Sequence, residues 1–165
     1  MEFKLGAHQS LVTKSQPWNF STDGDAEKLE NSMIRFMLDN NGIGLAANQI
    51  GLTKRVFVIG SENITGFPNP FALFNPKIIG YSDEQIVDKE GCLSYPGLFL
   101  MVKRPKWILA EYQDSKGNTN EIRIDGYLSK CFQHEYDHLD GVCFVDRVSQ
   151  LKLNLAMKKL GKKNK

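Results

Sequence analysis

Two histidines and a glutamate lie close together late in the sequence, in the order His134-Glu135-x-x-His138. On a helix, side chains four residues apart lie on one face, so both imidazoles can bind the same metal ion. A metal lowers the pKa of bound water from about 16 to about 7, and a neighbouring glutamate can take and return the proton. The spacing therefore indicates a metal-dependent hydrolase. The alternative is a helix that carries two histidines by chance.

A catalytic metal site usually has three protein ligands and one open position. One peptidase pattern places a third histidine six residues after the second, but that position is Phe144. Another takes a carboxylate from a later helix, and no acidic residue follows Asp146. These absences direct the search for the third ligand upstream, to the cysteines.

The chain has three cysteines. Cys131 lies seven helical residues before His138, about 10.5 Å along the axis, which predicts a small apolar wall and not a ligand. Cys143 is predicted to point into packing. Cys92 follows Gly91, where a sharp backbone path would aim its soft thiolate at a metal such as Fe(II), Zn, Ni or Co. A buried free cysteine in a strand explains Cys92 equally well.

The composition is typical of a soluble globular protein, and 165 residues fit one domain over 1–165. Residues 150–165 contain six lysines and no acidic residue, which leaves the rest of the chain net acidic. This basic segment fits either a solvated helix end or a surface that docks on RNA.

The cysteine count is odd and lacks a disulfide pattern, which favours reduced thiols inside a cell. No run approaches a membrane span, and the first residues lack the apolar stretch of a signal peptide. A cytoplasmic location is therefore predicted. For a viral protein this would be the cytoplasm of the host, and for a trimmed precursor it would be the interior of an organelle. His8 is predicted to be structural or exposed.

The periodicity of apolar residues predicts the surrounding elements. A first helix is expected over 25–40, a glycine-rich segment over 42–49, and a motif helix between Gly126 and Gly141. A last amphipathic helix over about 148–160 carries Leu151, Leu155 and Leu160. Strands are expected within 55–59, 70–79, 85–94, 106–112 and 121–125, with a hairpin turn at 116–118. The order predicts an α+β fold in which antiparallel sheets pack around the central motif helix.

Three segments together resemble, in order, the three signature motifs of the peptide deformylases. Residues 42–49 (GIGLAANQ) resemble G-x-G-L-A-A-x-Q, residues 90–94 (EGCLS) match E-G-C-L-S, and residues 133–138 (QHEYDH) match Q-H-E-x-D-H. The resemblance covers about residues 25–150. Its flanks match at 75–78 (NPKI), 95–97 (YPG) and 139–141 (LDG).

The resemblance implies a hydrolase that removes the N-formyl group from the initiator methionine of new polypeptides and releases formate. This would be a step of co-translational N-terminal processing. Carried over by position, Cys92, His134 and His138 would bind one divalent metal ion, and Glu135 would act as general base and acid. The family's natural metal is typically Fe(II), with Zn, Ni or Co able to take its place.

The resemblance also implies how the reacting carbonyl is held. Gln49 aligns with a side-chain amide, and Leu93 with a backbone N–H, that stabilise the developing oxyanion. Neutral donors aimed at an oxygen that gains charge lower the barrier by several kcal/mol, which suits these residue types. Gly44 would let the peptide backbone lie close.

A pocket for the first side chain is expected beside the metal. Tyr127 and Cys131 share a helix stripe with the histidines, and Ile43 comes from the glycine-rich segment. Such a pocket suits the unbranched, polarizable side chain of methionine. Tyr127 departs from the family, which usually has an aliphatic residue there, and this leaves the side-chain preference open.

Glu90 and Arg104 align with a charged pair that braces the cysteine loop in the family, against the alternative of two unrelated surface charges. The tail ends soon after Leu160, whereas bacterial relatives often continue into a longer helix that contacts the ribosome. A transient ribosome contact through this basic end is therefore a hypothesis. Neither membrane association nor sequence-specific nucleic-acid binding is expected.

Two other classes of protein fit parts of the sequence. An H-E-x-x-H peptidase is disfavoured because the downstream third ligand is missing. A non-catalytic metal- or peptide-binding protein is disfavoured by the intact Glu135 and Gln49.

Overall fold

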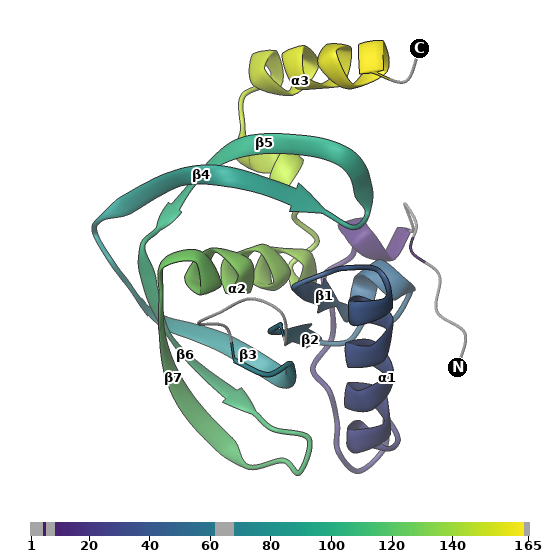
Figure 1. The fold of residues 1–165 in the computed structure, drawn as a ribbon. Helices are drawn as coiled ribbons and strands as arrows, with labels where there is room; N and C mark the ends of the chain where they lie inside the picture. Colours follow the sequence, from purple (N-terminus) through teal and green to yellow (C-terminus); the bar gives the residue numbers. More distant parts are fainter. Residues whose placement is uncertain (1–4, 6–8, 62–67, 164–165) are drawn as a thin grey trace.

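The structure is a computed structural model that describes residues 5, 9–61 and 68–163, so His8 lies outside the described residues. Its central element is α2 (Gly126–Leu139), which carries the two motif histidines. A five-stranded sheet lies on one side of α2, and the long β4–β5 ribbon arches over the other (Figure 1). The predicted α+β fold, with antiparallel sheets around the motif helix, is confirmed.

Every strand pair in the two sheets is antiparallel. The larger sheet has the order β1-β2-β3-β6-β7 and the smaller one pairs β4 with β5. The strands are β1 (Gly44–Ala46), β2 (Val56–Ile59), β3 (Phe71–Tyr81), β4 (Gln85–Cys92), β5 (Tyr95–Pro105), β6 (Trp107–Gln113) and β7 (Thr119–Asp125). The hairpin turn predicted at 116–118 joins β6 to β7.

Helix α1 (Ala26–Asp39) begins at Asp25, whose carboxylate accepts a hydrogen bond from the Lys28 N–H. This side-chain cap satisfies one of the free N–H groups at the helix start. Its buried stripe includes Leu29, Met33 and Met37, which pack on one face of the larger sheet. The expected helix over 25–40 is confirmed to within one residue.

Helix α2 is buried along most of its length because sheets cover two of its faces. Phe132 and Leu139 pack against the larger sheet, together with Phe57 of β2. The helix ends before Gly141, whose φ of 74° is left-handed. A Cβ at Gly141 would stand 2.8 Å from the backbone oxygen of Val12, in the short helix η1 (Gln9–Val12), so glycine is needed at this contact.

Helix α3 (Gln150–Lys163) follows the short helix η3 (Phe144–Arg147) and lies across β5 (Figure 1). Leu160, which belongs to the expected apolar face, packs against β5. Leu153, which does not belong to that face, packs there too. Leu151 and Leu155 instead face solvent, 69% and 61% exposed. The helix prediction is confirmed, but the apolar face that packs is rotated from the expected one.

The sequence pattern did not predict β5, β1 or the short helix η2 (Ala47–Ile50). In β5, Leu98, Leu100 and Val102 are buried while Phe99 and Met101 are exposed. Apolar side chains therefore occupy both faces of the strand and hide its alternation. None of the helices in the described part of the chain is long and apolar enough to cross a membrane.

Candidate metal centre and active site

Cys92, His134 and His138 converge at one point between β4 and α2. Their potential ligand atoms all lie within 4.8 Å of one another. The Cys92 Sγ is 3.3 Å from the His138 Nε2. Two such donors on one tetrahedral ion would lie about 3.5 Å apart, given typical metal–sulfur and metal–nitrogen bond lengths. The donor set and its spacing therefore fit a divalent metal ion.

Local backbone geometry aims the Cys92 sulfur at α2. The register of the β4–β5 pair shifts between Gly91 and Cys92, as in a β-bulge. A Cβ at Gly91 would meet the Phe99 ring at 2.7 Å, so the strand packs this closely only with glycine. The bulge and the turn that follows place Cys92 at the end of the ribbon, against the helix.

The His134 ring is oriented by a buried carboxylate. Its Nδ1 lies 3.0 Å from the Glu90 Oε2, which leaves Nε2 for a metal. A carboxylate behind a ligating histidine fixes its tautomer and makes the ring a better donor. Burial alone would raise the pKa of Glu90, but hydrogen bonds with His134 and Arg104 outweigh it and lower the pKa. Glu90 is therefore a carboxylate when it holds the ring.

Glu90 and Arg104 form a buried, bidentate ion pair. The Arg104 Nε and Nη2 lie 2.5 and 3.0 Å from the two Glu90 carboxylate oxygens. The side chains are 3% and 4% exposed, which contradicts the alternative of two surface charges. The pair ties β4 to β5 behind the cysteine, at the place where a brace was expected.

Sequence reasoning missed the continuation of this network through Asp137 and Arg147. The Asp137 Oδ2 accepts hydrogen bonds from the Arg104 Nη1 at 2.8 Å and the Arg147 Nε at 2.9 Å. Asp137 thus links the motif helix to β5 and to η3. The one sequence signal for this role of Asp137 was its position in the Q-H-E-x-D-H segment.

Glu135 is buried beside the three candidate ligands. Its Oε2 is buried without a hydrogen-bond partner among the described residues. Burial raises the pKa of Glu135 to about 7, and the charge of His134 offsets only part of this effect. A buried carboxyl oxygen without a partner is costly and calls for a functional reason. A group that exchanges a proton with a reactant supplies one.

Gly44 leaves the space that the Glu135 side chain fills. A Cβ at Gly44 would stand 2.4 Å from the Glu135 Oε1. We expect Gly44→Ala to displace this carboxylate and lower kcat/KM by about 10²-fold, because a shift of about 1 Å at a catalytic group costs this much. Steady-state kinetics would measure kcat/KM, and a thermal melt would show whether the variant is folded.

Gly161→Ala is the matched control, because a Cβ there meets nothing within 4 Å. It should leave kcat/KM unchanged. A folded Gly44→Ala protein with the wild-type rate would show that the carboxylate position is not critical.

Gln49 presents its amide nitrogen to the same centre. Its Oε1 accepts a hydrogen bond from the Ala46 N–H at 2.8 Å, which fixes the orientation of the amide. Its Nε2 lies 3.4 Å from the Cys92 Sγ and 3.1 Å from the Ser94 Oγ. Leu93 follows Cys92 in the turn between β4 and β5 and lines the same cavity. The donor predicted from Gln49 thus faces the candidate ligands.

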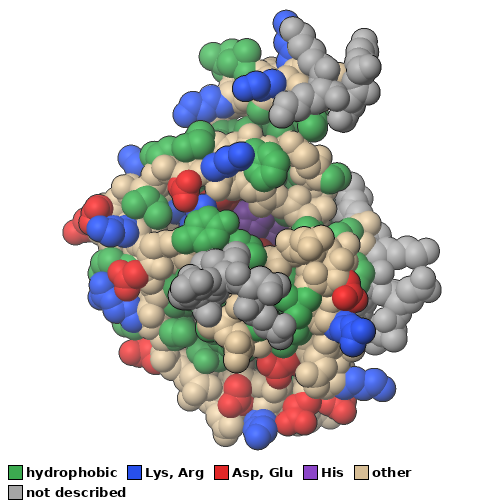
Figure 2. Space-filling model, viewed as in Figure 1, with side chains coloured by type: hydrophobic (Ala, Val, Ile, Leu, Met, Phe, Trp, Pro, Cys, Tyr) green, Lys and Arg blue, Asp and Glu red, His purple; other side chains and the backbone are tan. Residues whose placement is uncertain are grey.

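A cavity of about 450 Å³ opens beside these groups. Figure 2 shows histidine surface at the bottom of a hollow between hydrophobic side chains. The residues predicted to bind substrate all line it: Ile43, Gly44, Tyr127 and Cys131. The cavity therefore joins the candidate ligands to the expected side-chain pocket.

The other sequence expectations near the centre also fit the structure. Cys131 lines the cavity but does not belong to the ligand cluster found among the described residues. Cys143 is 2% exposed, with its Sγ 3.9 Å from the His138 Nδ1. Phe144, at the position of a third histidine in some peptidases, is buried with its ring centroid 5.6 Å from that of His134. The metal site of a peptidase of that pattern therefore lacks its third histidine here.

Cys131 should be a poor nucleophile. Burial raises its pKa to about 12, and the charge of Glu135 adds to the effect. Since the thiolate reacts, we expect iodoacetamide to label Cys131 at pH 8 roughly 10³-fold more slowly in the folded protein than in urea. Peptide mass mapping over time would measure both rates. Rates within tenfold of each other would contradict a buried, protonated thiol.

The fold and the candidate site together fit the class of metal hydrolases, with the Cys92 thiol beside the two histidines of the H-E-x-x-H helix. The family model of the polypeptide deformylases matches residues 3–154. The chain belongs to this family. The resemblance is confirmed, and with it the predicted enzyme class, a metal-dependent hydrolase.

Individual relatives agree with the family model. The chain is 40% identical to a peptide deformylase of Wolbachia pipientis wMel over 169 residues, which cover 98% of this chain and 94% of the relative. A crystal structure of a Synechococcus elongatus peptide deformylase with actinonin has a TM-score of 0.86 and 37% identity, covering 96% and 88%. A Met-Ala-Ser-bound deformylase of Acinetobacter baumannii has a TM-score of 0.82 and 29% identity, covering 90% and 99%.

Proposed function

We propose that this deformylase hydrolyses the formyl amide of N-formylmethionyl peptides at a metal ion held by Cys92, His134 and His138. The observation that carries the proposal is the convergence of three ligand atoms within 4.8 Å, beside the buried carboxyl of Glu135. The products are formate and a peptide with a free N-terminal methionine. The relative that binds Met-Ala-Ser holds a peptide of this kind.

One thiolate and two imidazoles suit several divalent ions. Fe(II) is the native ion in this proposal, and Zn, Ni or Co fit the same donors. Such an ion, when bound, would supply Lewis acidity and would lower the pKa of water to about 7. The protein's part is to fix the ligands, which it does through Glu90 behind His134 and the bulge at Cys92.

Glu135 moves the proton in this mechanism. Its carboxylate takes a proton from the water that attacks the formyl carbon, and the new C–O bond places negative charge on the former carbonyl oxygen. The Gln49 amide and the Leu93 N–H donate hydrogen bonds to that oxygen. Glu135 then gives the proton to the amide nitrogen as the C–N bond breaks, so the peptide leaves as a neutral amine.

The cavity wall positions the substrate. Gly44 and Glu135 line the cavity together, and the peptide backbone lies close to Gly44 in this proposal. Ile43, Tyr127 and Cys131 enclose the first side chain. A mostly apolar pocket of this kind suits a methionine side chain.

Formate release tests the proposal. The chain is purified anaerobically, loaded in turn with Fe(II), Ni(II) and Co(II), and assayed with formyl-Met-Ala-Ser. We expect formate and Met-Ala-Ser in equal amounts. No release with any of the three ions would contradict the proposed function.

We also propose that the outer face of α3 makes a transient contact with the ribosome. The protein would then act in the cytoplasm, where new chains are made. Exposed Leu151 and Leu155 lie among the exposed lysines Lys152, Lys158 and Lys159. Basic side chains attract RNA phosphates in a salt-dependent manner. Deleting residues 150–165 should weaken salt-sensitive cosedimentation with ribosomes, and unchanged cosedimentation would rule this contact out.

A further inference from the structure

A lysine is buried in the wall of the substrate cavity. Lys130 lines the cavity, and its side chain is only 3% exposed. It precedes His134 by one helical turn, so it lies about 6 Å further along the axis, away from the candidate metal ligands. Lysine is almost never fully buried unless its charge is paired. Its place in the cavity wall therefore requires partners for its charge.

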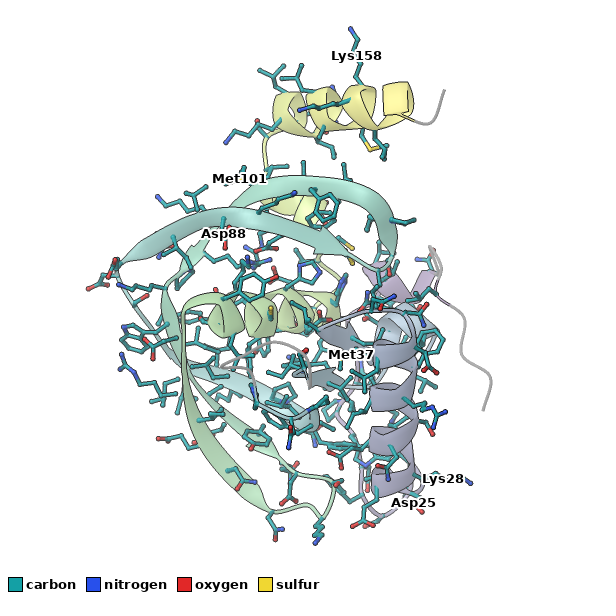
Figure 3. All side chains as sticks on the ribbon, viewed as in Figure 1. Asp25, Lys28, Met37, Asp88, Met101 and Lys158 are labelled. Atoms are coloured by element: carbon teal, nitrogen blue, oxygen red, sulfur yellow. The ribbon has the colours of Figure 1, made fainter. Side chains whose placement is uncertain are left out.

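Three groups hold the Lys130 ammonium. Its Nζ lies 2.7 Å from the Asp88 Oδ2 and 3.0 Å from the backbone oxygen of Lys89. It also lies 3.8 Å from the centre of the Tyr127 ring, a cation–π contact. Figure 3 labels Asp88 on β4, beside the first turns of α2. The ion pair joins β4 to α2 at this end of the cavity.

The lining of the cavity changes in chemistry along α2. His134 and Glu135 line it beside the candidate ligands, whereas Cys131, Lys130 and Tyr127 line it one to two helical turns nearer the start of the helix. Two N–H groups of the ammonium are bound to oxygen atoms, and among the described residues the third faces only the Tyr127 ring. An acceptor atom of a substrate can share this third N–H group, whereas an apolar side chain gains nothing from it.

We propose that Lys130 is a specificity-determining residue that makes the pocket prefer a first side chain with an acceptor atom near its end. The inference rests on the proposed function, because it assumes that the first side chain enters this cavity. Methionine carries a sulfur, a weak acceptor, where its isostere norleucine has a methylene group. Glutamine has nearly the same length and a stronger acceptor.

The wild-type enzyme is tested with three peptides that differ only in their first residue: formyl-Met-Ala-Ser, formyl-norleucine-Ala-Ser and formyl-Gln-Ala-Ser. We expect kcat/KM to be about fivefold higher for methionine than for norleucine, mainly through KM. Equal values would overturn the inference and leave the deformylase function intact. No formate from any peptide would instead overturn the proposed function.

Lys130→Met removes the charge and keeps the length of the side chain. We expect the methionine-to-norleucine ratio to fall to about one, and kcat/KM for the glutamine peptide to fall at least tenfold, with little change for norleucine. Lys106→Met is the control, since Lys106 pairs with Glu84 on the surface, 3.0 Å away and outside the cavity. A folded Lys130→Met enzyme with the wild-type ratio would contradict the inference.

Asp88→Ala serves if Lys130→Met does not fold, because it keeps the lysine and removes its half-exposed partner. With the carboxylate acceptor lost, Lys130 is freer to donate to a substrate. We expect the preference for the methionine and glutamine peptides over norleucine to be kept or to rise. Loss of the preference in this variant would contradict a direct role of the lysine.

Discussion

Replacing Glu135 with glutamine is expected to lower kcat/KM for formyl-Met-Ala-Ser by about 10³-fold while the protein still binds one metal ion per chain. Glutamine keeps the shape of the side chain but cannot take a proton from water. General acid–base catalysis contributes about 10²–10⁴-fold. The ligand cluster does not include Glu135, so the metal should stay.

Metal content by elemental analysis and single-turnover formate release would measure both parts of this expectation. Glu111→Gln, an exposed change on β6, is the control and should keep the wild-type rate. A Glu135→Gln enzyme that keeps its metal and its full rate would show that another group moves the proton.

Replacing Cys92 with alanine is expected to weaken metal binding by more than about 100-fold and to abolish formate release. Losing even a group behind a ligand costs about 10–100-fold in affinity, and Cys92 would be a ligand itself. Its sulfur lies 3.3 Å from the His138 Nε2, and no other cysteine of the described residues belongs to the cluster of candidate ligands. Competition with a chromogenic chelator would measure the affinity.

Cys131→Ala is the matched control, because this cysteine lines the cavity outside the ligand cluster. It should bind metal within a few-fold of wild type. If Cys92→Ala bound metal as tightly as wild type, the third ligand would have to be sought elsewhere.

Local patterns were sufficient to predict the elements that present the histidines. The spacing of His134 and His138 needs only helical periodicity, and the same periodicity of apolar residues predicted α1. Cys92 was different, because its residue type fits a metal ligand and a buried free thiol equally well. Its order relative to the other two motifs, not its own surroundings, favoured the ligand.

Features that depend on contacts between distant segments were not predictable in this way. The link from Arg104 through Asp137 to Arg147 exists only because β5, α2 and η3 meet. The packed face of α3 was set by β5, which lies under Leu153 and Leu160. Lys130 would be placed on the surface by its type, and its burial depends on contacts with Asp88 and the backbone of Lys89 that only the folded chain provides.

A titration of the metal-free protein with Co(II) tests the central claim most directly, with absorbance and formate release followed in the same samples. Thiolate ligation by Cys92 predicts a sulfur-to-cobalt charge-transfer band that saturates at one ion per chain. Formate release from formyl-Met-Ala-Ser should rise in parallel with that band. Activity without the band, or a saturated band without activity, would contradict a catalytic centre built from Cys92, His134 and His138.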